Sequence, residues 1–270
     1  DGTYIVENVT ETILTANSLT YVTGQQTTVV SGGVIISVTM NNWTSETASF
    51  TFYQSNTFGG SGQDVLKSTF ENLNGDQILI GSSTSNDGDV MSNFGSTDGW
   101  IIKIDATYNN LLASKNIGGS SEDVLNAGFQ LASSDYLFHG YSTSSDVNLP
   151  ANYGNIDAWA TMVSEDFSNL LVSKNFGGSN IDAFKQVIEL PDGNFLFLGN
   201  SMSNDIDLPN NYGGNDVWVM RTDANLNIIW SQNYGGSGED LALSFFLFTG
   251  NEITIVSTST STDFDSQYGI

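Results

Sequence analysis

Acidic residues recur at fixed positions in the polar loops of this sequence, and carboxylate oxygens are ligands that calcium prefers. The set comprises Asp87, Asp89, Asp98, Asp146, Asp157, Asp205, Asp207, Asp216, Asp263 and Asp265. The alternation Asp-x-Asp places two carboxylates on one side of a loop, where a calcium ion would use both. Aspartates in loops also order the chain by accepting hydrogen bonds from nearby backbone amides. No copy carries the full EF-hand pattern, so the sequence leaves two interpretations open, calcium ligands and loop-ordering turns.

Residues suited to catalysis are scarce. His139 is the only histidine, which excludes a histidine metal cluster and makes any Ser–His–Asp triad depend on it alone. Paired carboxylates would serve glycoside hydrolysis, but the 30 acidic residues follow a repeat and do not gather in one place. We therefore predict a non-enzyme with no catalytic residues, in which calcium is the one candidate cofactor.

A Gly-Gly-Ser-x-x-Asp motif organises the rest of the chain. Its four aspartates, Asp64, Asp123, Asp182 and Asp240, are 59, 59 and 58 residues apart. Such regular self-similarity indicates a repeat architecture. The glycines suit a tight turn, and the aspartate suits capping of freed amides. No lysine follows, as a phosphate-binding loop would require, so the motif is predicted to be structural.

The elements that must position the loop aspartates can be read from the 58–116 copy. After the motif come an apolar run, a turn at Asn74-Gly75 and a second β-type run at 77–81. The polar loop 82–97 leads to a third strand at 98–105 and a fourth at 111–116. Four short strands per repeat are typical of a β-propeller blade. Tryptophan recurs at one position of the third strand, in Trp100, Trp159 and Trp218, and is predicted to fill the core between blades.

The predicted fold is therefore all-β, a single β-propeller array of four-stranded blades over 1–270. The predicted blades are 1–57 (degenerate), 58–116, 117–175, 176–233 and a partial fifth at 234–270. In the first blade, 17–24 and 32–38 match strands of the later copies. The array is either a closed five-bladed propeller or part of a larger one, and we favour the larger.

The charge balance limits the partners. With 30 Asp and Glu against 6 Lys and Arg, the formal net charge is -24, which disfavours nucleic acid and anionic lipid surfaces. No run of about 18 apolar residues is present, so no membrane insertion is expected. The chain has no cysteine, so neither disulfides nor thiolate metal sites are expected.

The repeat resembles a known group. The pattern Tyr234-Gly235-Gly236-Ser237-x-x-Asp240, with Asp192-Gly193 and the Asp216-Val217-Trp218 strand, is similar to repeats of large secreted proteins of Bacteroidota. The resemblance covers about 58–270. It implies export by the type IX route and a place at the cell surface, among adhesins or modules that accompany enzymes.

These observations predict a secreted, cell-surface binding or assembly module. The loops 82–97, 141–156 and 200–215 would present a face to a glycan or a protein, stiffened by any bound calcium. A structural spacer within a large adhesin or filament is one alternative, and a polysaccharide hydrolase or lyase on a propeller scaffold is another.

Overall fold

The computed structural model describes residues 14–16, 27–31, 34–39, 48–149, 151–247 and 252–263, with side chains from residue 56 onward. All regular structure in these ranges is β-strand, and the strands pair antiparallel in four four-stranded sheets and one two-stranded sheet. We number the sheets 1 to 5 in chain order.

Sheets 2 to 4 are meanders in which the strands pair in chain order. Sheet 2 contains β5 (Asp64–Glu71), β6 (Gln77–Ser83), β7 (Asp98–Ile104) and β8 (Leu111–Ile117). Sheet 3 contains β9 (Asp123–Gln130), β10 (Tyr136–Ser142), β11 (Asp157–Val163) and β12 (Leu170–Phe176). Sheet 4 contains β13 (Asp182–Glu189), β14 (Phe195–Ser201), β15 (Asp216–Thr222) and β16 (Ile228–Tyr234). Sheet 5 contains β17 (Asp240–Leu247) and β18 (Ile253–Ser259).

Sheet 1 departs from this order. It contains β1 (Leu14–Ala16), β2 (Thr27–Ser31), β3 (Val34–Thr39) and β4 (Ala48–Thr57), paired as β1-β4-β3-β2. Of the strand expected at 32–38, the described part, 34–38, lies in β3. The strand expected at 17–24 lies outside the described residues, and β2 is a strand that the comparison with later copies did not predict.

Local sequence explains how the strands connect. At the predicted Asn74-Gly75 turn, Gly75 has a φ of 85° and its amide donates to the Asn72 carbonyl at 3.0 Å. Glycine adopts this left-handed conformation without steric cost. The hairpin pairs Phe70 with Ile78, which fixes the register of β5 against β6.

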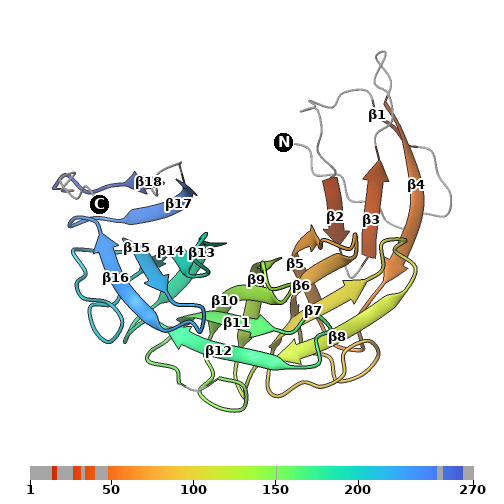
Figure 1. Ribbon diagram of the computed structural model, residues 1–270, viewed down its shortest axis with the longest axis horizontal. Helices are drawn as coiled ribbons and strands as arrows, with labels where there is room; N and C mark the ends of the chain where they lie inside the picture. The colour runs from red at the N-terminus through yellow and green to blue at the C-terminus, as the bar shows by residue number, and fades with distance from the viewer. Residues whose placement is uncertain are drawn as a thin grey trace.

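The sheets follow one another along an arc (Figure 1). The first strands β5, β9 and β13 lie toward its concave side, and the fourth strands β8, β12 and β16 lie toward its outer side. Apolar side chains fill the space between successive sheets: one cluster joins Ile78 and Ile101 of sheet 2 to Phe138 and Trp159 of sheet 3.

The three repeated tryptophans are core residues, as predicted. Trp100, Trp159 and Trp218 are at most 1% exposed. Each indole N–H donates to a serine hydroxyl of the fourth strand, as from Trp159 to Ser173 at 2.9 Å, so burial leaves no indole donor unpaired. A Cβ at Gly99 would lie 3.0 Å from the Trp159 ring, which shows how closely sheet 3 approaches sheet 2.

Candidate functional site

The loops between second and third strands are held by the Gly-Gly-Ser turn of their own sheet. In sheet 4 the Ser179 amide donates to Asp205 Oδ1 at 2.8 Å, and the Gly177 amide donates to Asp207 Oδ2 at 3.1 Å. Equivalent serine amides donate to Asp87, Asp146 and Asp263 in sheets 2, 3 and 5. The glycine amide contact recurs with Asp89 in sheet 2 and with Asn148 in sheet 3. These loop aspartates therefore order the loop through backbone amides.

The motif aspartate also bonds to the Gly-Gly-Ser turn and to the loop, and we call this set of hydrogen bonds the clip. The fully buried Asp182 accepts from the Gly178 amide at 2.8 Å, from the Ser203 hydroxyl at 2.7 Å and from the Ser201 hydroxyl. Asp123 has the same three kinds of partner in sheet 3, namely Gly119, Ser142 and Ser144. The Gly-Gly-Ser-x-x-Asp motif thus joins a turn, the end of the second strand and the loop that follows it.

The aspartates that begin the third strands have a different environment. Asp98, Asp157 and Asp216 are fully buried, and one oxygen of each accepts from the amide of Phe94, Tyr153 or Tyr212 at 2.5–2.6 Å. The other oxygen, Oδ1, has no hydrogen-bond partner in any of the three. Burial raises the pKa of Asp98 and Asp157 to about 7 and that of Asp216 to about 6, and a nearby aspartate on the next sheet adds to each shift.

Sequence reasoning missed the second aspartate near each third-strand aspartate, because it belongs to the next repeat. The Asp123 amide donates to the Thr97 carbonyl at 2.8 Å, and the Asp182 and Asp240 amides donate to Ile156 and Asn215 in the same way. These bonds join the start of one sheet to the residue before the third strand of the preceding sheet. We call each such place a junction; it brings a third-strand aspartate beside a motif aspartate.

Nine of the ten predicted calcium ligands lie in the described residues and fall into two groups. The loop aspartates are Asp87, Asp89, Asp146, Asp205, Asp207 and Asp263, and the third-strand aspartates are Asp98, Asp157 and Asp216. Among the described residues, no three or more carboxylate or histidine groups converge as metal ligands. Asp265 lies outside the described residues.

The outer parts of the loops carry exposed apolar side chains at repeated positions. Phe94, Tyr153 and Tyr212 are each 39% exposed and occupy one position of the repeat. Val147 and Ile206 occupy another, are 62% and 59% exposed, and have φ angles of 57° and 61°. Positive φ is a genuine outlier for a β-branched residue, and Gly88 holds the same place in sheet 2 with a φ of 68°.

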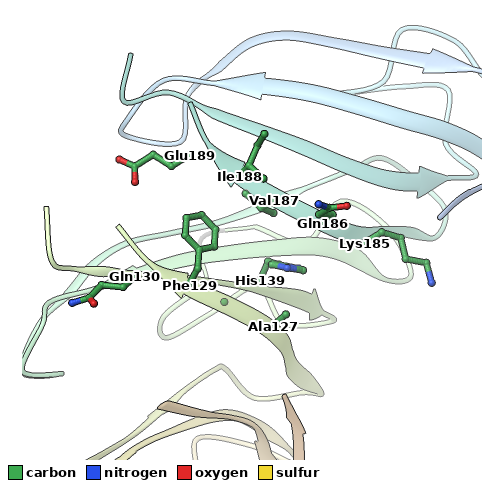
Figure 2. A pocket seen from close by; sticks show the side chains of 10 residues that line it. Ala127, Phe129, Gln130, His139, Lys185, Gln186, Val187, Ile188 and Glu189 are labelled. Atoms are coloured by element: carbon green, nitrogen blue, oxygen red, sulfur yellow. The ribbon is translucent and has the colours of Figure 1, made fainter. Parts of the chain in front are cut away.

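A separate groove of about 580 Å³ lies between β9 and β13. Figure 2 shows His139 and Phe129 on one side and Lys185 to Glu189 on the other. His139 is 5% exposed, its Nδ1 has no partner, and burial lowers its pKa to about 4. The matched residues in sheets 2 and 4 are Ile80 and Leu198. No nucleophile, acid and base are assembled there, so the groove gives no catalytic constellation among the described residues.

No protein-family model matches the chain, and no curated protein sequence is significantly similar to it. Within the part of the chain that the structure describes, no helix is long and apolar enough to span a membrane.

Proposed function

We propose that the sheets are blades of a β-propeller and that the chain is a non-catalytic binding module, whose loop face contacts a protein partner. Four-strand meanders that succeed one another along an arc support the propeller. The resemblance of the repeat implies that the chain belongs to a cell-surface protein exported by the type IX route.

One observation carries the binding role: the strained and exposed Val147 and Ile206. A left-handed conformation costs a residue with a Cβ about 1–2 kcal/mol, and side chains as exposed as these recover little of that cost by packing. Gly88 meets the same backbone requirement without this cost. Strain without a structural return is typical of functional positions, so these side chains are proposed to contact the partner.

The chemistry of the face favours a protein over a glycan. Branched aliphatic tips fit apolar pockets, and aromatic Tyr153 and Tyr212 supply the amphipathic contacts common in protein interfaces. The net charge of -24 favours a partner that is basic around those pockets. The fixed scaffold below the loops lowers the entropic cost of binding, since the loops are already held by the amides of the Gly-Gly-Ser turns.

Binding screens with the wild type and the Val147→Gly/Ile206→Gly double variant test the proposal. A glycan array and an array of basic and acidic proteins are probed with both chains, and Ile229→Ser, an exposed outer-strand change, is the matched control. We expect the double variant to lose at least about tenfold in affinity for basic proteins, with the control unchanged. Binding confined to glycans would assign the face to carbohydrate.

Two alternatives from other classes have distinct outcomes. Equal behaviour of wild type and double variant on every array would favour a structural spacer. Turnover of a polysaccharide that is lost on changing one Asp or Glu would identify a hydrolase or lyase.

A further inference from the structure

Two buried carboxylates from neighbouring sheets meet at each of three junctions. A Cβ at Gly118 would overlap Asp98 Oδ1 and lie 2.9 Å from Asp123 Oδ2. A Cβ at Gly235 would similarly overlap Asp216 Oδ1 and lie 2.9 Å from Asp240 Oδ2. Both oxygens of each pair therefore border the same small space beside a glycine.

The remaining junction has the same arrangement. A Cβ at Gly177 would lie 2.6 Å from Asp182 Oδ2 and 3.1 Å from Asp157 Oδ1. A third carboxylate, Asp207, is close enough to influence Asp157 electrostatically.

No positive group of the described residues offsets these charges. The ion pairs found there are Lys103–Asp76 and Arg221–Asp192, and both lie elsewhere. Asp98, Asp157 and Asp216 are 0% exposed, and each has an Oδ1 without a hydrogen-bond partner that lies near the same glycine as Oδ2 of the second carboxylate. Buried carboxyl groups in proteins are protonated, paired with a positive group or bound to a metal, and an unpaired oxygen beside a second carboxylate offers a cation two ligands.

We propose that each junction binds one divalent cation, calcium by its ligand chemistry, between the third-strand aspartate of one sheet and the motif aspartate of the next. Calcium accepts carboxylate oxygens in irregular geometry, and water or backbone carbonyls complete its shell. The motif aspartates Asp123 and Asp182 each accept three hydrogen bonds, and Asp240 accepts two, from Gly236 and Ser261. In Asp123 and Asp182 these bonds lower the pKa against the larger raising effect of burial, so they partly favour the ionised form that a cation would bind. The site differs from the loop aspartates in that each third-strand aspartate brings a fully buried Oδ1 that accepts no hydrogen bond.

The number of sites follows from the repeat. The position that matches Asp98 in the first copy is Gly32, which has no carboxylate, and the three atoms nearest to a Cβ at Gly59 all belong to Asp64. The junction between sheets 1 and 2 therefore lacks its second carboxylate. We expect three ions per chain.

Isothermal titration of the metal-free protein with calcium alone, at pH 7.5 in 150 mM salt, tests the proposal. We expect a stoichiometry of three, reduced to two in Asp157→Asn and, independently, in Asp216→Asn. Asp192→Asn is the matched control, because this carboxylate is exposed and pairs with Arg221, and it should bind three ions. The asparagine variants retain an oxygen for the Tyr153 and Tyr212 amides, which limits misfolding.

Wild-type melting provides a second measurement that needs no variant. Calcium at 1 mM should raise the Tm by about 5 °C or more, and magnesium should raise it less. A Tm unmoved by calcium, a wild-type stoichiometry below one, or asparagine variants that bind as many ions as the wild type would overturn the proposal. The result is independent of the loop partner, so failure here leaves the proposed binding role standing, and the reverse also holds.

Discussion

Replacing the motif aspartate of sheet 4 should destabilise the protein even when no metal is present. Asp182→Ala removes three hydrogen bonds from a fully buried carboxylate, those from Gly178, Ser201 and Ser203. Hydrogen bonds to a charged acceptor contribute about 1.5 kcal/mol each, which totals about 4.5 kcal/mol. Burial raises the pKa of Asp182, so the ionised carboxylate itself has a cost that alanine relieves. We therefore expect a net loss of about 3 kcal/mol.

Urea unfolding followed by circular dichroism, in EDTA, measures this loss without any contribution from bound calcium. Asp192→Ala is the control, because its carboxylate is half-exposed in a turn and its ion pair with Arg221 should contribute less than about 1 kcal/mol. Limited proteolysis should cut the 200–215 loop faster in Asp182→Ala, since the clip no longer holds Ser203. If Asp182→Ala and Asp192→Ala unfolded at the same urea concentration, the assignment of the motif as a clip would be wrong.

Three further changes test other parts of the structure. His139→Leu should stabilise the protein by about 2 kcal/mol more at pH 5 than at pH 7.5. The folded-state pKa of His139 is about 4 against an ordinary 6.5, so the free energy of unfolding of the wild type falls as the pH drops through this range. Equal gains at both pH values would contradict a buried neutral histidine. Gly140→Ala should lower the free energy of unfolding in urea by more than about 3 kcal/mol, because the added Cβ would overlap the Val124 carbonyl oxygen. Gly193→Ala should cost only about 1 kcal/mol of backbone strain, because no atom lies within 4 Å of its added Cβ. Ile206→Gly should leave thermal stability unchanged or raise it by up to about 1 kcal/mol, and a clear loss would mean that Ile206 packs in the folded protein.

Much of the fold could be predicted because the repeat reports local structure. The Asn74-Gly75 turn, the tryptophan strands and the four-strand unit all depend on contacts within about 60 residues, and each leaves a periodic signal. Sheet 1 was harder to predict, because β1 pairs with the edge of β4 that does not contact β3, and such non-local pairing has no sequence signature.

The candidate site was also predictable only where it depends on local sequence. A turn interpretation of Asp87 and Asp205 was available, since aspartate in a loop commonly accepts amides. The junction pair Asp98 and Asp123 was not, because each residue reads as an ordinary strand start and only packing of adjacent sheets brings them together. The strain at Val147 and Ile206 also escapes sequence reasoning, although their alignment with Gly88 was a usable signal.

The two classes of aspartate differ in how their charge is offset, and this difference decides what the array requires. A loop aspartate such as Asp205 is stabilised by amides of its own sheet, so each sheet carries its own compensation. A third-strand aspartate such as Asp157 receives one amide, and the next sheet brings it a second carboxylate in place of a positive charge. Every added junction therefore adds an uncompensated pair, and the cost grows with the number of sheets. A cation at each junction converts that repulsion into a link between sheets, so the availability of divalent ions would set how firmly the loop face is held together.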